Sequence, residues 1–311
     1  MNNMAYEMHA DTGEADVHHI HRCLQPPKTF KTAKQTVSIV QTSRFGEALF
    51  IDGAIQSTRT DEALYHVPLV HGASAFLENP PRNVLIIGGG EGCVARELLK
   101  YNTIESITQV DWDVELVDYF RRGPGRSWNG GVYDDPRVRV IHDDIFTEAN
   151  AIYTQSYDLI LVDLCDPDGE SIGMLKALIV RLFGLLVDGG VFLMNAGAVM
   201  PKVVASDDSI YAAELLNYAG SLGSARDYKA FSYKIYVPSY MAPWCLVGLA
   251  RGNTIGDWVG GHDVDVSAWM TYDRSYDPVF QSVNAEFMRY RGSVAPSASA
   301  SELMSAGEWG C

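Results

Sequence analysis

Three stretches decide the fold: VLIIGGGEG at residues 84–92, ITQVDWD at residues 107–113 and YDLILVDLCDP at residues 157–167. VLIIGGGEG and YDLILVDLCDP contain short apolar runs typical of buried strands, ITQVDWD holds the strand between them, and segments of helical period separate the three. The repeated strand-then-helix order predicts a parallel, doubly wound sheet. Ligands bind beyond the carboxyl ends of such strands. The acids at these ends, which we expect to share one pocket suited to a cationic ligand, are Glu91, Asp111, Asp163 and Asp166.

The pattern outside these stretches divides the chain into four parts. Residues 1–24 are polar and are predicted to be a flexible, poorly ordered segment. Residues 25–66 alternate like paired strands and predict a small antiparallel β-hairpin domain. Residues 67–292 form the predicted Rossmann-like α/β domain, with FSYKIYVPS and WCLVGLARG as a closing antiparallel pair. Residues 293–311 are rich in Ser and Ala and are predicted to be a flexible tail.

Composition and charge exclude several classes of protein. The chain has 311 residues and a formal net charge of −15, which argues against a nucleic-acid partner bound through a basic surface and fits a cationic ligand. No run approaches about 18 apolar residues, so we expect no transmembrane helix and no membrane partner. The acidic N-terminus lacks the apolar core of a secretory signal. We therefore expect a cytoplasmic protein.

Cysteine and histidine spacing predicts neither a disulfide framework nor a metal site. The five cysteines are scattered without CxxC pairing and are interpreted as reduced thiols. For Cys93 and Cys165, within the pocket motifs, a small buried apolar role is favoured over a reactive nucleophile. No second cluster completes a tetrahedral site with the N-terminal group of His18, His19, His21 and Cys23.

The glycine-rich turn indicates a nucleotide-type ligand. Gly88, Gly90 and Gly92 follow a strand and precede a helix, where glycines let the backbone approach a ligand. Asp111 ends the next strand, where an acid accepts the ribose hydroxyls of an adenosine moiety. The spacing is GxGxG, and Glu91 would repel a pyrophosphate. We therefore favour a nucleoside with a positive substituent over a dinucleotide or a purely structural turn.

Two further groups of acids have both functional and structural interpretations. Asp144 is our choice to accept a hydrogen bond from an adenine amine, while Asp143 is as well explained as a helix cap. Asp163 and Asp166 stand on a turn fixed by Pro167, and such a pair can bind an ammonium group or accept a proton. Their alternative role is turn formation, because Asp-Pro is ordinary turn chemistry.

The order of the motifs resembles the polyamine aminopropyltransferases, the family of spermidine, spermine and thermospermine synthases. The resemblance runs from about residue 34 to residue 249. Glu91, where spermidine synthases usually carry Asp, and the following ARELLKYNT are most similar to the thermospermine synthase branch. The pieces that carry the resemblance are FGEALFIDGAIQS, DEALYHVPLVH, VLIIGGGEGCVARELLK, VDWD, DDPRVRVIHDD, YDLILVDLCDP and VPSYMAPW.

The resemblance implies transfer of the 3-aminopropyl group of decarboxylated S-adenosylmethionine to a polyamine acceptor, with methylthioadenosine leaving. It implies a class I methyltransferase-like fold, no metal and no tightly bound cofactor, since the donor is a co-substrate. It also implies a homodimer or homotetramer joined through the β domain. Because Glu91 would repel the carboxylate of intact S-adenosylmethionine, a class I methyltransferase is the weaker alternative. A non-catalytic polyamine-binding homologue is the other.

The resemblance also assigns site residues by position. Asp163 is the proton acceptor, Asp166 an anchor for the acceptor amine, and Tyr240 lies near the reacting nitrogen. The residues placed in catalysis are Asp163, Tyr65 and Tyr240. Those placed at the donor are Gln35, Gly88, Gly90, Glu91, Gly92, Asp111, Asp144 and Ile145. Those placed on the acceptor side are His66, Gln56, Asp166 and Trp244.

The acceptor side departs most from the family pattern. The helix after His66 continues Val67-Pro68-Leu69, without the usual acid. The closing motif reads YMAPW. On the donor side, Ile145 stands where spermidine synthases usually have glycine beside the adenine. The sequence therefore leaves the acceptor open between putrescine, spermidine and longer amines.

Overall fold

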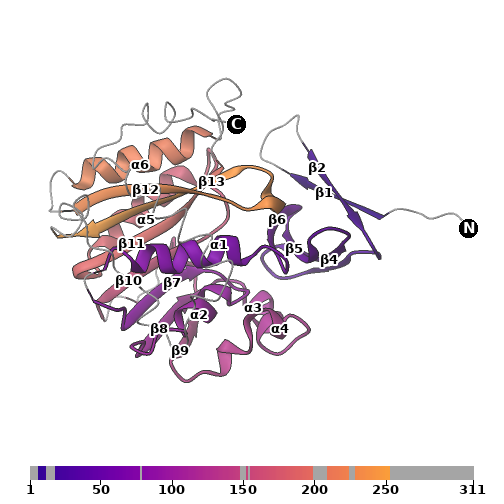
Figure 1. The fold of residues 1–311 in the computed structure, drawn as a ribbon, viewed down its shortest axis with the longest axis horizontal. Helices are drawn as coiled ribbons and strands as arrows, with labels where there is room; N and C mark the ends of the chain where they lie inside the picture. Colours follow the sequence, from indigo (N-terminus) through magenta and orange to yellow (C-terminus); the bar gives the residue numbers. More distant parts are fainter. Residues whose placement is uncertain are drawn as a thin grey trace, which may run out of the picture.

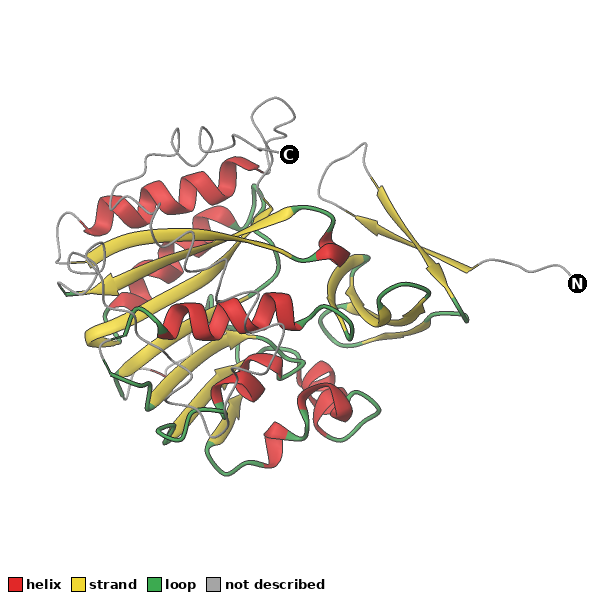
Figure 2. Cartoon of the chain, in the orientation of Figure 1, coloured by secondary structure: helices red, strands yellow, loops and turns green. Residues whose placement is uncertain are grey.

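The protein is built from a small and a large β-sheet that lie beside each other, with helices on both faces of the large one (Figures 1 and 2). The predicted tail, residues 293–311, and residues 253–292 before it lie outside the residues that the structure describes. Those residues of the computed structural model are 6–11, 18–77, 79–147, 152, 155–198, 209–223 and 228–252.

The small sheet is antiparallel and has the strand order β1-β2-β4-β5-β6, with β3 paired to β4. The predicted hairpin is confirmed, because β4 and β5 pair from Val37–Ile51 to Thr42–Gly46 around the turn. The strands are β1 Tyr6–Asp11, β2 His18–Cys23, β3 Lys28–Lys31, β4 Thr36–Thr42, β5 Gly46–Ile51 and β6 Ala54–Thr58.

Two strands lie within the N-terminal segment that the sequence predicts to be flexible. Strands β1 and β2 form an antiparallel pair, and β2 meets β4 through Cys23 and Thr42. Strands added at a sheet edge pair through backbone hydrogen bonds, which do not require an alternation of apolar and polar residues. The polar sequence of this segment therefore gave no sign of the two strands. His21, a candidate metal ligand by sequence, is 7% exposed and lies edge-on to the rings of Phe45 and Phe50.

The large sheet confirms the predicted doubly wound architecture. Its strand order is β12-β13-β11-β10-β7-β8-β9. Strands β11, β10, β7, β8 and β9 are parallel, and β13 and β12 close one edge as an antiparallel pair. The strands are β7 Asn83–Gly88, β8 Ser106–Val110, β9 Val138–Ile141, β10 Tyr157–Asp163, β11 Leu186–Ala198, β12 Tyr228–Tyr236 and β13 Pro243–Arg251.

Helices cover both faces of this sheet. Val84 and Ile86 of β7 pack into one core with α1 to α4, while Leu85 and Ile87 point into a second core with α5 and α6. Two buried faces explain the continuous apolar runs of the parallel strands. The helices are α1 Ala63–Val67, π-helix η1 Pro68–Gly72, α2 Cys93–Leu98, α3 Val114–Arg121, α4 Arg126–Asn129, 3₁₀-helix η2 Val132–Asp134, α5 Ile172–Phe183, α6 Ser209–Gly223 and 3₁₀-helix η4 Pro238–Tyr240.

The topology places the switch point beside β7. The chain continues from β7 to β8 and β9 on one side, and returns to β10 and β11 on the other. The carboxyl ends of β7, β8 and β10 therefore open at one edge of the sheet, which is where doubly wound folds bind ligands. Within the described residues, no helix is both long and apolar enough to cross a membrane.

Candidate active site

A single cavity lies at this edge, walled on its other side by the small sheet through Leu49, Ile51 and Ile55. The four acids expected to converge do so, since all of them line this cavity. The sequence-predicted site residues that line it are Gln35, Gln56, Tyr65, His66, Gly88, Gly90, Glu91, Asp111, Asp163, Asp166, Tyr240 and Trp244.

The glycine turn after β7 brings two strand ends unusually close together. Gly88 has φ +81°, and a Cβ there would lie 2.1 Å from the carbonyl oxygen of Asp163. A Cβ on Gly90 would lie 2.8 Å from Oδ2 of Asp111. Only glycine permits both the left-handed backbone and these approaches. The turn thus sets the floor of the cavity between the two aspartates.

Gly92 has a different place from the one predicted. It is the N-cap of α2 with φ +83°, and a Cβ there would lie 2.9 Å from Nδ2 of Asn129 and 3.0 Å from the ring of Tyr133. Gly92 is not among the residues that line the cavity. The two residues it packs against hold the turn: Asn129 Nδ2 donates to the Glu91 carbonyl at 2.8 Å, and the Tyr133 hydroxyl to the Gly90 carbonyl at 2.8 Å.

Asp111 is a buried carboxylate, 7% exposed, at the end of β8. Burial raises the pKa of its carboxyl to about 7, and nearby Asp113, Glu91 and Asp163 add to the rise, while a hydrogen bond from the Asp113 amide at 2.9 Å opposes it. A buried acid with so little compensation is suited to accept donors from a ligand.

Asp163 ends β10 and faces the same cavity. The Tyr65 hydroxyl donates to its Oδ1 at 2.7 Å. Burial and the charge of Glu91 raise the pKa of Asp163 to about 6, although His66 and the Tyr65 hydrogen bond act in the opposite direction. The carboxylate is therefore mostly ionised at neutral pH, and it is oriented by Tyr65.

Asp166 is held by a residue that the sequence analysis missed. Nδ2 of Asn195 donates to Oδ1 of Asp166 at 2.9 Å and to the Leu164 carbonyl at 3.1 Å. Asn195 follows the apolar run of β11, so the same strand-end rule that found the acids could have found it. Its amide fixes the orientation of the Asp166 carboxylate.

The other wall is aromatic and comes from η4 and β13. The Tyr240 ring lies 5.9 Å from the Tyr65 ring and 4.9 Å from the Trp244 ring, between centroids. The Tyr240 hydroxyl donates to the Gln56 carbonyl at 2.5 Å. Asp61 fixes the turn before Tyr240, because it accepts hydrogen bonds from the amide and hydroxyl of Ser239 at 2.8 and 2.9 Å.

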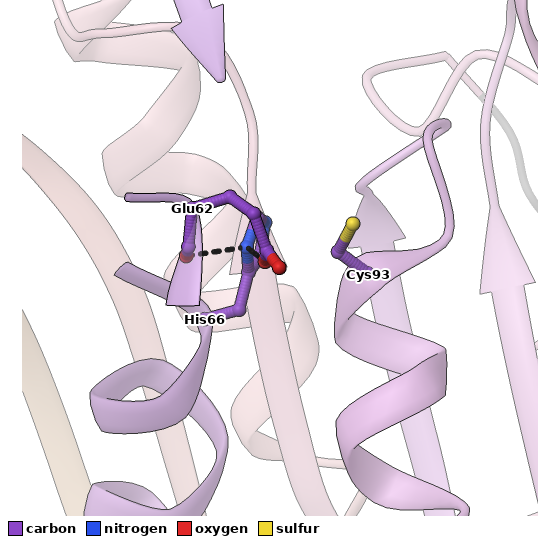
Figure 3. Close-up of side chains that lie close together, drawn as sticks. All are labelled: Glu62, His66 and Cys93. Atoms are coloured by element: carbon purple, nitrogen blue, oxygen red, sulfur yellow. Dashed lines mark hydrogen bonds and ion pairs between the residues drawn. The ribbon is translucent and has the colours of Figure 1, made fainter. Parts of the chain in front are cut away.

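His66 was placed on the acceptor side by resemblance, and the structure sets it against two acids. Its Nδ1 lies 2.8 Å from Oε2 of Glu62 and its Nε2 lies 2.9 Å from Oε1 of Glu91. Figure 3 shows Glu62 and His66 joined in this way opposite Cys93. Burial would lower the pKa of His66, but the hydrogen bonds and charges of Glu62 and Glu91 raise it to about 10.

The group of Glu62, His66 and Cys93 has metal-like spacing but unsuitable chemistry. Their ligand atoms lie within 4.8 Å of one another. Both imidazole nitrogens are engaged by carboxylates, and burial raises the pKa of the Cys93 thiol well above its usual value. A metal needs a deprotonated thiol and a neutral imidazole. This donor set therefore does not fit a metal ion.

The two pocket-motif cysteines differ from each other. Cys93 is fully buried, as predicted. The expectation of burial is wrong for Cys165, which is exposed and lines the cavity between Asp163 and Asp166. It follows β10, on the turn that leads from this strand toward α5.

The structure does not bring Asp144 and Ile145 to the cavity lining. Oδ1 of Asp144 accepts the amide of Phe146 at 2.9 Å, and Ile145 is 5% exposed within the core on the α5 side. Their contact with an adenine stays a prediction. Trp112, which the sequence analysis missed, lines the cavity beside Asp111, with Lys34 Nζ 4.8 Å from its ring centroid.

Comparison with known proteins identifies the family. The Spermine/spermidine synthase domain matches residues 59–253. A polyamine aminopropyltransferase of Saccharolobus islandicus is 38% identical over 169 residues, covering 53% of this chain and 56% of that protein. Polyamine aminopropyltransferase 1 of Hyperthermus butylicus is 36% identical over 219 residues, covering 67% and 68%. The chain thus spans little more than half the length of the Saccharolobus relatives that it matches.

Solved structures share the fold. Spermidine synthase from Thermotoga maritima superposes with a TM-score of 0.71 at 19% identity, covering 94% of this chain and 96% of that one. A spermidine synthase in complex with the transition-state analogue AdoDATO gives a TM-score of 0.70 at 20% identity, with the same coverage. Together with the domain match over residues 59–253, these findings show that the chain belongs to the spermine/spermidine synthase domain family.

Proposed function

We propose that this chain is an aminopropyltransferase, which moves the 3-aminopropyl group of decarboxylated S-adenosylmethionine to a polyamine such as putrescine or spermidine and releases methylthioadenosine. Family membership and the name of the curated relatives support this activity. The observation that carries the proposal is the convergence of Glu91, Asp111 and Asp163 on one cavity. A donor that bears a sulfonium and an ammonium, and no carboxylate, matches such a cavity.

The donor would lie along the floor of the cavity. Glu91 would pair with the donor ammonium, and Asp111 would accept its ribose hydroxyls. Gln35 lines the same region from the small sheet. The adenine would lie beyond the ribose, where the face of Trp112 offers a stacking surface. In this arrangement the activated methylene would lie near Asp163.

The reaction is a displacement at carbon. The amine nitrogen forms a bond to the methylene next to the sulfonium, the carbon–sulfur bond breaks, and its electron pair stays on sulfur as a neutral thioether. The attacking nitrogen must lose a proton, although a free alkyl ammonium has a pKa near 10.4. Nearby carboxylates raise that value, while the sulfonium and desolvation lower it. Asp163, ionised at neutral pH, would accept the proton, and orientation by the site would supply much of the acceleration.

The acceptor would enter along the aromatic wall. Asp166, oriented by Asn195, would anchor one acceptor ammonium. Tyr240 and Trp244 would enclose the methylene chain, with Gln56 at the wall and Tyr65 beside the reacting nitrogen. Because residues on this side depart from the family pattern, the length of the acceptor has to be determined by experiment.

The donor would be consumed as a co-substrate, so no tightly bound cofactor is part of the proposal. We further propose a homodimer or homotetramer joined through the small sheet, in the cytoplasm, as the family resemblance implies. Size-exclusion chromatography with light scattering tests the assembly.

Turnover with a panel of amines tests the activity. The protein is incubated with decarboxylated S-adenosylmethionine and di-, tri- and tetra-amines, and products are separated by chromatography and identified by mass spectrometry. The proposal expects methylthioadenosine in equal amount to one lengthened polyamine, with spermine and thermospermine resolved by retention. Methylated product from intact S-adenosylmethionine would instead indicate a methyltransferase. Amine binding without any product would indicate a non-catalytic homologue.

A further inference from the structure

A chain of alternating charges runs from the half-buried Arg96 through Glu62 and His66 to Glu91 at the cavity. Nη2 of Arg96 lies 2.9 and 2.8 Å from the two carboxylate oxygens of Glu62. Glu62 contacts His66, and His66 contacts Glu91. Glu91 and His66 line the cavity, whereas Glu62 and Arg96 do not. The outer pair of this chain therefore acts on a ligand only through the inner pair.

The hydrogen bonds define the protonation state of His66. Both ring nitrogens face carboxylate oxygens, at 2.8 Å to Glu62 and 2.9 Å to Glu91. Nδ1 also lies 2.8 Å from the backbone carbonyl oxygen of Glu62, a second acceptor at that nitrogen. A carboxylate accepts and does not donate, so both nitrogens must carry a proton and the ring is an imidazolium. The side chain is 2% exposed, so the surrounding acids and not water stabilise this charge.

Of the two acids that contact His66, Glu62 is held in place more firmly than Glu91. Burial alone would raise the pKa of Glu62, yet the hydrogen bonds and charges of His66 and Arg96 lower it to about 2. Nη1 of Arg96 also donates to the Trp128 carbonyl at 2.8 Å, which anchors the guanidinium on α4. Arg96 and Glu62 thus form a rigid support behind the imidazolium.

The imidazolium constrains Glu91 in turn. Nε2 of His66 donates a hydrogen bond to Oε1 of Glu91, and within the described residues no hydrogen bond is formed to Oε2 of Glu91. The charge of His66 also lowers the pKa of Asp163, opposing burial and Glu91. The charged and titratable groups around the ring are Glu62 and Tyr65 from the α1 region, Glu91 and Cys93 from the turn and α2, and Asp163 from β10; Arg96 lies behind Glu62.

We propose that Glu62 and Arg96 are positioning residues of the donor site: they hold His66 as a cation against Oε1 of Glu91, so that Oε2 is presented to the ligand's ammonium. The inference rests on the proposed function for the identity of that ammonium. Without the charge of Glu62, the backbone carbonyl of residue 62 would still hold the Nδ1 proton of His66, while the Nε2 proton would be lost and with it Glu91 would lose its fixed direction.

Binding measurements test the proposal without turnover. Calorimetric titration of the full chain compares decarboxylated S-adenosylmethionine with methylthioadenosine, which lacks the ammonium. Glu62→Gln should weaken binding of the decarboxylated donor by about tenfold or more, the scale of one hydrogen bond to a charged group, and leave methylthioadenosine within about twofold. The matched control is Glu105→Gln, since Glu105 pairs with Arg82 on the surface, and it should change neither.

A loss shared equally by both ligands, or no loss, would overturn the proposal. If Glu62→Gln does not fold, Arg96→Lys keeps the charge, removes the fork geometry and should show the same selectivity at smaller size. Nitrogen-15 spectra add a direct readout: the His66 imidazolium signal should persist at pH 8 in the wild type and in Glu105→Gln, and be lost in Glu62→Gln. Failure of the proposed function looks different, because the wild type itself would then bind intact S-adenosylmethionine as well as the decarboxylated form.

Discussion

Asp111 and Asp163 are carboxylates that the fold holds close to other acids. Burial raises the pKa of Asp111 to about 7, and burial with the charge of Glu91 raises that of Asp163 to about 6. His66 is the nearby cation, and it is already engaged by Glu62 and Glu91. A ligand with two positive charges would relieve this repulsion. The aspartates that favour binding of such a ligand are therefore the same ones proposed to act in the reaction.

Asp163→Asn tests the assignment of the proton acceptor. The amide keeps the shape of the side chain and loses its basicity, so kcat should fall by about 100-fold to 10,000-fold. The affinity for the donor should change only a few-fold. Single-turnover kinetics and calorimetry separate the two quantities, with Asp188→Asn as the control because Asp188 is 91% exposed. Weakened donor binding with intact turnover would contradict the assignment.

Tyr65→Phe tests how Asp163 is kept charged. The Tyr65 hydroxyl donates to the ionised carboxylate and so lowers its pKa. Removing a hydrogen bond to a charged group costs about 1.5–3 kcal/mol, which should raise the pKa of Asp163 and move the acid limb of kcat upward by about one to two pH units. The pH profile of kcat measures this. Exposed Tyr236→Phe should leave the limb in place, and an unmoved limb in Tyr65→Phe would refute the role.

The acids of the site could be predicted from the sequence, but two of the contacts that hold them were not. Glu91, Asp111, Asp163 and Asp166 could be predicted because each stands at the end of an apolar strand. The pairing of His66 with Glu91 could not, since it joins α1 to a turn distant in sequence and no local pattern reports it. Asn195 was missed only because the strand-end rule was applied to acids alone.

At the scale of elements, the site depends on β7 and β10 lying in register. Val162 pairs with Ile87 and Asp163 with Gly88, so the strand ends stop at the same level. The Gly89 amide donates to the Asp163 carbonyl at 3.1 Å, which continues the ladder into the turn. The glycine turn is therefore part of the sheet as well as part of the cavity.

Gly88→Ala should disrupt this junction. Any side chain at φ +81° costs about 1–2 kcal/mol, and a Cβ 2.1 Å from the Asp163 carbonyl oxygen adds about 1–3 kcal/mol more of overpacking. The matched control is Gly130→Ala, with φ +70° and nothing within 4 Å of its Cβ. Denaturant unfolding should show a clearly larger loss for Gly88→Ala. Equal losses would mean that the strands separate without cost.

The elements that could and could not be predicted differ in what stabilises them. Strands β7 and β10 have apolar residues on both faces, so their apolar runs predicted them closely. Strands β1 and β2 join the sheet through backbone pairing, which has no apolar signature. The η1 π-turn begins at Pro68, and the helical periodicity predicted a helix there but not its type.

The whole molecule combines an acid-lined cavity with a net charge of −15. Two sheets are needed to close that cavity, because the large sheet supplies the acids and the small one supplies Leu49, Ile51 and Ile55. The free protein therefore stores electrostatic repulsion at the junction of its two sheets.

This repulsion should make the free protein less stable as the pH rises from 5.5 to 8.5. Folded Asp111 and Asp163 titrate near 7 and 6, while the unfolded chain releases those protons near 3.9, so the folded state binds more protons in between. His66 acts in the same direction, because its contribution is complete below about 6.5 and is lost as the pH rises toward 10.

Scanning calorimetry at several pH values measures the effect. Tm should fall by at least about 3 °C across this range, the change expected for about one pKa unit in a chain of this size. Bound decarboxylated S-adenosylmethionine should reduce the fall, since it supplies the missing positive charge. A Tm that is flat or rises with pH would show that the acids are compensated in the free protein.

The most direct test of the cationic-donor site is a pair of calorimetric titrations at pH 7.5, one with decarboxylated and one with intact S-adenosylmethionine. The two ligands differ by a single carboxylate. Glu91 should repel this carboxylate in intact S-adenosylmethionine. In the decarboxylated form the carboxylate is absent, and the ammonium is free to pair with Glu91. We predict at least about 100-fold tighter binding of the decarboxylated form, equivalent to about 2.7 kcal/mol. Equal affinities, or a preference for the intact form, would contradict the account.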